Sequence, residues 1–233
     1  MTMRMLPRLD QRSWRLALGV AVLGYALLAA GSGLDRLSAT SYAAEQATPA
    51  PFRVIAEARA AERLIESGIP ESALDPAQRL VARDPLGSGS AALLGAALLG
   101  QGKAGPADQA FRLAAQRGWR DARTQLYWLR VALAQGEPKL AALRFGALAR
   151  QWPQAPAVGQ IALVFEANPA GRQALAERIA AGDRWAADYA QPGEAIAPAQ
   201  LAGRAEVLLT AAGLGTKLGC GRAIVRVQQP PAR

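Results

Sequence analysis

The sequence contains no histidine, and Cys220 is the one cysteine among its 233 residues. Without histidine there is no Ser-His-Asp triad, no Cys-His dyad and no histidine-ligated zinc, haem or di-iron site. A single cysteine allows neither an intramolecular disulfide nor a thiolate zinc site. These absences remove much of the enzyme repertoire, and we expect no metal and no cofactor.

Lysine and aromatic residues are also scarce, while alanine is abundant. There are 3 Lys beside 24 Arg, aromatic residues make up 6% of the chain, and 54 residues are Ala. Alanine is the best helix former and aromatic residues favour strands, so the composition predicts an all-α fold. The net charge of +9 does not predict nucleic-acid binding, because four of the arginines flank the N-terminal apolar segment and no aromatic stacking platform accompanies the rest.

Residues 16–34 form an uncharged, largely apolar run, which as a helix spans roughly the 30 Å hydrocarbon core of a membrane. The basic segment 1–15 carries Arg4, Arg8, Arg12 and Arg15, so the positive-inside rule predicts a cytoplasmic N-terminus and an exported remainder. A cleaved signal peptide is the alternative, with a small-x-small site at Ser41-Tyr42-Ala43; a buried core helix is another. The length of the run favours an uncleaved anchor, and residues 35–53 then read as a flexible linker.

Three glycines, Gly68, Gly102 and Gly136, follow one another at intervals of 34 residues. Other small, large and turn positions keep the same interval. Those after the glycines are Ala73, Ala107 and Ala141; Ala77, Phe111 and Phe145; and Pro85, Trp119 and Pro153, while Ala61, Gly95 and Leu129 precede them. The pattern predicts helical hairpins in which glycine ends the first helix in a left-handed turn and alanine lets the second helix cross closely. Pro76 lies within the first of these second helices, which should therefore kink or begin late.

These positions resemble the tetratricopeptide repeat family, in the membrane-anchored form found in bacterial envelopes. The resemblance implies a right-handed solenoid of three to four helical hairpins: three 34-residue repeats over 54–155, a degenerate repeat with capping helices over 156–212, and a Gly/Pro-rich tail over 213–233. The early helix positions depart from the family pattern, because Glu57, Ala60, Ala91 and Leu94 stand where an aromatic residue and a leucine are usual. An unrelated helical bundle is the alternative.

The resemblance also implies a concave groove lined by the first helix of each hairpin. Its lining would be Ile55, Ala58, Glu62, Ala92, Ala96, Leu99, Arg123, Leu126, Arg130 and Leu133. Arg123, Tyr127 and Arg130 lie about one turn apart and would form a stripe for an apolar or acidic partner segment. We assign partner binding to Arg123, Leu126, Tyr127, Arg130, Leu99 and Glu62; packing of the stripe against the degenerate repeat, for example with Glu166, is the alternative.

The sequence therefore favours a non-enzymatic scaffold, tethered to the bacterial inner membrane with its solenoid in the periplasm. By analogy with the family, it would hold other envelope proteins and serve cell-envelope or polysaccharide-export machinery. Alternating Glu57, Arg59, Glu62, Arg63 and Glu66 read as a solvated helix face rather than as catalytic groups. An enzyme acting on envelope polymers is the alternative. It would use Glu166, Glu177, Asp183 and Asp188, with Trp185 and Tyr189 as sugar-stacking rings.

Overall fold

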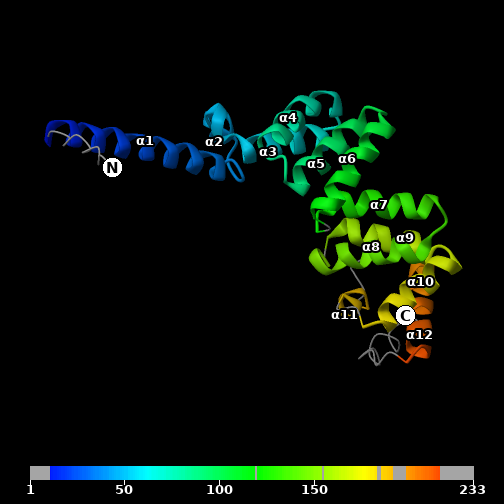
Figure 1. The fold of residues 1–233 in the computed structure, drawn as a ribbon. Helices are drawn as coiled ribbons and strands as arrows, with labels where there is room; N and C mark the ends of the chain where they lie inside the picture. The colour runs from blue at the N-terminus through cyan, green and yellow to red at the C-terminus, as the bar shows by residue number, and fades with distance from the viewer. Residues whose placement is uncertain (1–10, 119, 154, 183–184, 191–197, 216–233) are drawn as a thin grey trace, which may run out of the picture. The chain divides into compact units, whose positions relative to one another are not determined.

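All regular secondary structure described by the computed structural model, which covers residues 11–118, 120–153, 155–182, 185–190 and 198–215, is helical (Figure 1). The predicted all-α fold is thus confirmed for these residues. The chain divides into two compact units, residues 1–113 and 114–233, and the division falls within α6. Trp119, Asp183 and the tail from residue 216 onward, with Cys220, lie outside the described residues.

The first unit contains the N-terminal helix, a short segment that follows it and the first helical hairpins. Its helices are α1 (Gln11–Leu37), α2 (Tyr42–Ala47), the 3-10 helix η1 (Ala50–Phe52), α3 (Val54–Glu66), α4 (Pro70–Arg83), α5 (Ser88–Gly100) and α6 (Ala104–Arg117). The second unit contains α7 (Ala122–Ala134), α8 (Pro138–Gln151), α9 (Pro156–Glu166), α10 (Pro169–Ala180), α11 (Ala186–Tyr189) and α12 (Pro198–Gly213).

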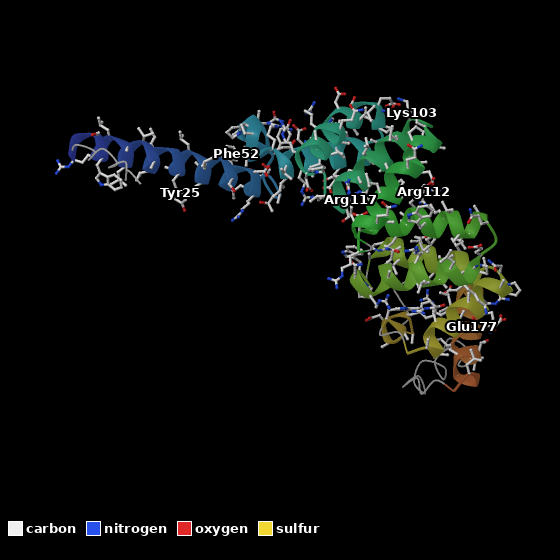
Figure 2. The ribbon with its side chains drawn as sticks, in the orientation of Figure 1. Tyr25, Phe52, Lys103, Arg112, Arg117 and Glu177 are labelled. Carbon is white, nitrogen blue, oxygen red and sulfur yellow. The ribbon has the colours of Figure 1, made fainter. Side chains whose placement is uncertain are left out.

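Helix α1 is long and apolar enough over Ser13–Leu37 to cross a membrane. Its side chains are almost all exposed, and Tyr25 projects away from the helix without covering by the rest of the unit (Figure 2). A row of exposed Leu, Val and Tyr side chains is costly in water, so this helix is not a core helix of the first unit. Its length and exposure are compatible with a single-pass anchor.

The residues that follow the apolar run fold against the end of α1, and this corrects the prediction of a flexible linker over 35–53. The Asp35 carboxylate accepts hydrogen bonds from the backbone N–H groups of Ile55 (3.1 Å) and Ala56 (3.0 Å), so it caps α3 from α1. The half-buried ring of Phe52 packs so closely on Gly31 that a Cβ atom at position 31 would overlap it. Arg53, the residue before α3, makes no side-chain cap of its own.

Two polar pairs also join α1, α2 and α3. Together with the Asp35 cap and the contact of Phe52 with Gly31, they are here called the clamp. The Glu45 carboxylate is buried and accepts two hydrogen bonds from Arg63, at 2.7 and 2.5 Å. Ser38 and Thr48 share a buried hydrogen bond of 3.1 Å between their hydroxyl oxygens. Because both partners of each pair are satisfied, the segment can be buried without the cost of unpaired polar groups.

The helix boundaries recur at 34-residue intervals. Helices α3, α5, α7 and α9 begin at residues 54, 88, 122 and 156, and α4, α6 and α8 begin at residues 70, 104 and 138. The predicted left-handed turns are present, with φ of 73° at Gly68, 73° at Gly102 and 72° at Gly136. An L residue with a side chain rarely adopts this backbone conformation, which explains why glycine stands at all three turns.

Small residues allow the helices to approach closely. Ala73, Ala107 and Ala141, the alanines predicted at the crossings, are completely buried. At Gly95 a Cβ atom would lie 2.9 Å from the ring of Phe111, so glycine lets α6 pack directly on α5. Pro76 does not delay α4, which begins at Pro70; the carbonyl that loses its N–H partner belongs to Ser72, which is exposed and can be hydrated.

The second unit has a larger, more aromatic core. The rings of Phe145 and Trp185 meet edge to face with centroids 5.2 Å apart, and Tyr189 meets Trp185 in the same way at 5.6 Å. The helix α7 begins at the predicted N-cap Asp121, whose carboxylate accepts a 2.8 Å bond from the Thr124 N–H. Asn168 caps α10 in the same way through the N–H of Gly171, at 2.7 Å.

Candidate partner-binding groove

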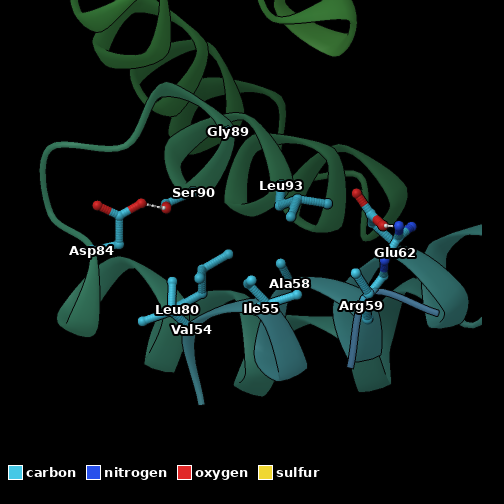
Figure 3. A pocket seen from close by; sticks show the side chains of 11 residues that line it. Val54, Ile55, Ala58, Arg59, Glu62, Leu80, Asp84, Gly89, Ser90 and Leu93 are labelled. Carbon is cyan, nitrogen blue, oxygen red and sulfur yellow. Dashed lines mark hydrogen bonds and ion pairs between the residues drawn. The ribbon is translucent and has the colours of Figure 1, made fainter. Parts of the chain in front are cut away.

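A groove of about 310 Å³ lies between α3 and α5 in the first unit. Figure 3 shows its apolar middle and a polar pair at each end. At one end the Ser90 hydroxyl donates to Asp84 at 2.8 Å, and at the other the Arg59 guanidinium contacts Glu62 at 2.9 Å. The apolar side chains between these pairs are Val54, Ile55, Ala58, Leu80 and Leu93.

The groove exists because small residues stand where the two helices face each other. Ala58 on α3, Gly89 on α5 and Ala39 after α1 all line it and fill little of the space. The apolar side chains repeat at helical spacing along α3, so they share one face. Val54, Ile55 and Ala58 form a half-buried apolar strip over the buried Leu80 and Leu93, with a hydrogen-bonded carboxylate at either end. Such a strip suits an apolar segment of another chain rather than a small charged ligand.

Three of the lining residues predicted on α3, namely Ile55, Ala58 and Glu62, do line this groove. On α5 the structure differs from the prediction. Its lining residues are Gly89, Ser90 and Leu93, whereas Ala92 is completely buried in the core and Leu99 is exposed outside the groove. Ala96, also predicted on α5, is half-buried and does not line this groove. The pattern gives little guidance on α5, because this helix is apolar all round.

The predicted stripe lies on α7 in the second unit. Arg130 is exposed, while Arg123, Leu126 and Tyr127 are half-buried. Leu126 packs against the core of that unit, and the Tyr127 ring meets Trp128 edge to face at 5.2 Å. Of the six residues assigned to partner binding, four are therefore on α7, while Glu62 and Leu99 belong to α3 and α5 of the first unit.

Glu57 is not part of a solvated helix face, and this corrects the interpretation of the charge pairs on α3. Its side chain is only 3% exposed and contacts the guanidinium groups of Arg53 (3.3 Å), Arg79 (3.0 Å) and Arg83 (3.1 Å). Burial raises the pKa of the Glu57 carboxyl, but the hydrogen bonds and positive charges of Arg79, Arg53 and Arg83 outweigh it, and the pKa is lowered. Glu57 is thus a buried, charged residue whose ion pairs join α3 to α4.

A second buried carboxylate, Glu166, joins three elements of the second unit. Its Oε1 accepts hydrogen bonds from the Tyr189 hydroxyl (2.7 Å) and from Arg204 Nε (2.9 Å), which tie α9 to α11 and α12. Burial of the Tyr189 hydroxyl and the adjacent negative charge of Glu166 raise the pKa of Tyr189 well above its ordinary value, so the phenol stays protonated and donates. Glu166 is therefore engaged here rather than with the α7 stripe.

The other residues considered for carbohydrate chemistry are placed as follows. Trp185 and Tyr189 are buried in the core, so neither ring presents a face on which a sugar could stack. Glu177 forms a 2.9 Å ion pair with Lys139, and Asp188 is half-buried. Across the described ranges, no three Cys, Asp or Glu side chains gather into a set that could hold a metal ion.

Comparisons with known proteins gave no match to this chain, whether with family models, with curated proteins or with solved structures.

Proposed function

We propose that the protein is a binding scaffold held in the bacterial inner membrane by α1, with its N-terminus in the cytoplasm and its helical units in the periplasm. Its role is to hold a segment of another envelope protein rather than to catalyse a reaction. The groove between α3 and α5 is the observation that carries this proposal, because it offers an apolar strip with polar ends close to the membrane helix.

We also propose that the hairpins are tetratricopeptide-like repeats forming a right-handed solenoid. The 34-residue interval of the helix starts, the matching backbone angles of Gly68, Gly102 and Gly136, and the complete burial of the crossing alanines support this proposal. The degenerate fourth unit would correspond to α9 and α10, with α12 as its cap.

The clamp at the end of α1 supports an uncleaved anchor over a signal peptide. Cleavage after Ala43 would remove Asp35, which caps α3, and Gly31, on which Phe52 packs. A mature chain beginning at Ala44 would leave the first N–H groups of α3 without this cap, at a cost of about 1 kcal/mol or more. This loss supports the proposal that the anchor stays attached to the folded unit.

Tethering makes a modest groove useful. A partner confined to the same membrane meets the groove at a raised effective concentration, so a short apolar contact suffices for association. The exposed Arg130 and its neighbours on α7 would give a second contact, suited to acidic residues of the partner.

Site-specific photo-cross-linking in intact membranes tests the groove. A cross-linking residue at Ile55 is expected to give a discrete adduct with one envelope protein, while the same residue at Gln78, on the exposed side of α4, gives none. Ala58→Leu should abolish the adduct by filling the groove, whereas Ala82→Leu, an exposed position on α4, should leave it unchanged.

Thermal unfolding of the same variants separates groove filling from loss of fold. An adduct that persists in a folded Ala58→Leu variant, or that forms equally at Gln78, would show that the groove is not the binding site.

A further inference from the structure

The carboxylates around the end of α1 are turned inward, while the arginines beside them face outward. Asp35, Glu45 and Glu57 are all buried. In contrast, the side chains of Arg63 and Arg79 are 45% and 51% exposed, and Arg36 is exposed as well. The charged side chains that face solvent here are therefore mostly arginines, and the carboxylates that pair with Arg63 and Arg79 lie beneath them.

The length of α1 sets where this surface lies in a membrane. Residues 16–34 rise about 28 Å at about 1.5 Å per residue, which matches the hydrocarbon core and places Asp35 and Arg36 at the level of the lipid head groups. The bonds from Asp35 to the N–H groups of Ile55 and Ala56 hold the first turn of α3 at the same level. Glu57 and its arginines follow directly after this turn.

The balance of charge at this level is positive. Arg36, Arg53, Arg79 and Arg83, here called the arginine rim, outnumber Asp35, Glu57 and Asp84. Asp84 lines the groove with Val54 and Ile55, while Glu45 and Arg63 neutralise each other. Part of the rim's hydrogen-bonding capacity is unused. Arg79 binds Glu57 through Nε and Nη2, Arg83 does so through Nη1 alone, and Arg36 has no ion-pair partner among the residues that the structure describes.

We propose that the arginine rim binds the phosphate groups of anionic lipids in the leaflet where α1 emerges. This inference rests on the proposed anchoring by α1. A guanidinium group matches phosphate oxygens with paired donors, and its weak hydration lowers the cost of leaving water. The rim would hold the groove at a defined height above the membrane, because Val54 and Ile55 at the start of α3 line the groove and the Asp35 cap fixes that turn.

The test uses the full chain reconstituted in phosphatidylcholine vesicles. Electron paramagnetic resonance of spin-labelled lipids gives the preference for phosphatidylglycerol over phosphatidylcholine at the protein surface. Arg36→Gln with Arg79→Gln is expected to lower this preference, by about five-fold for each arginine at most. Glu57 keeps Arg53 and Arg83 in this variant, and Arg36→Gln alone removes no ion pair within the part of the chain that the structure describes.

The matched control is Lys103→Gln with Arg112→Gln, which removes the same charge from exposed positions on and before α6. Lys103 follows the Gly102 turn at the other end of the helices, since Gly100 packs against Pro70 at the start of α4. The N-terminal arginines are the same in every variant, so their contribution cancels in the comparison.

Lipid binding by the arginine rim is supported if the preference for phosphatidylglycerol falls in the rim variant but not in the control. The preference of the wild type should also weaken as salt is added. If the rim variant and the control prefer phosphatidylglycerol equally and the protein remains embedded, lipid binding by the arginine rim is overturned while the anchor stands. This is the result expected if the arginine rim binds an acidic protein segment instead of lipid. Failure of the wild-type chain to remain in the vesicles overturns both the anchor and the rim.

Discussion

Three buried carboxylates, Asp35, Glu57 and Glu166, carry much of the specific structure at the scale of single residues. Each is bonded to groups distant in sequence. Asp35 binds backbone N–H groups of α3, Glu57 binds arginines of α4, and Glu166 binds Tyr189 and Arg204. A buried carboxylate is costly unless it is paired, and removing a partner leaves an uncompensated charge. These residues therefore fix particular contacts instead of adding general stability.

Asp35→Ala should destabilise the first unit by about 1–2 kcal/mol, because two N–H groups at the start of α3 lose their acceptor. Chemical unfolding of the chain in detergent measures this change. Asp108→Ala serves as the control, since Asp108 is only half-buried and pairs with the exposed Arg112 on its own helix. Equal effects of the two substitutions would show that the cap contributes nothing specific.

The lowered pKa of Glu57 predicts a pH dependence of stability. Its folded-state pKa lies below the ordinary value of 4.5, so its contribution is fully present above that value and is lost as the pH falls through the folded-state pKa. The difference in unfolding free energy between wild type and Glu57→Gln should therefore be constant near neutral pH and shrink below about pH 4.5. A difference that does not change between pH 7 and pH 3 would contradict the ion-pair account.

At the scale of helices and hairpins, much could be predicted from local sequence patterns. The Gly turns, the crossing alanines and the Asp121 cap are encoded within a few residues of where they act. The clamp over 35–53 could not be found in this way, because Asp35 caps a helix about 20 residues further on. A usable signal was present in hindsight: α3 follows Arg53, which is not a capping residue, so its cap had to come from elsewhere.

The predicted lining residues match the groove on α3 and differ from it on α5 for a related reason. Alternating polar and apolar residues give α3 a face, whereas nearly every residue of α5 is apolar and its orientation is set by packing. The burial of Glu57 was missed because its partners Arg79 and Arg83 lie on another helix, while local charge pairs on α3 suggested a solvated face.

Close packing between hairpin helices predicts that enlarging the crossing alanines is destabilising. Ala107→Leu and Ala141→Leu should each cost about 1–3 kcal/mol by overpacking, since both side chains are completely buried. Ala82→Leu, at an exposed position on α4, is the matched control and should change stability little. Thermal unfolding of the three variants makes the comparison, and near-equal midpoints would mean that the alanines are not at tight crossings.

At the scale of the whole molecule, the proposed scaffold depends on α1 remaining attached to the helical units. The apolar stretch of α1 is exposed along its length, and its C-terminal end is bonded into the unit that carries the groove. An anchor joined in this way both retains the protein at the membrane and positions the groove. A cleaved leader would do neither, and the folded unit would lose its Asp35 cap.

The mass of the mature protein, measured after expression in a bacterium and separation of membrane from soluble fractions, tests this claim most directly. We expect a membrane-bound chain that still contains residues 16–34 and extends to Arg233. A soluble periplasmic form that begins near Ala44 would contradict the account, since it would show that α1 is removed and that the helical units work without their anchor.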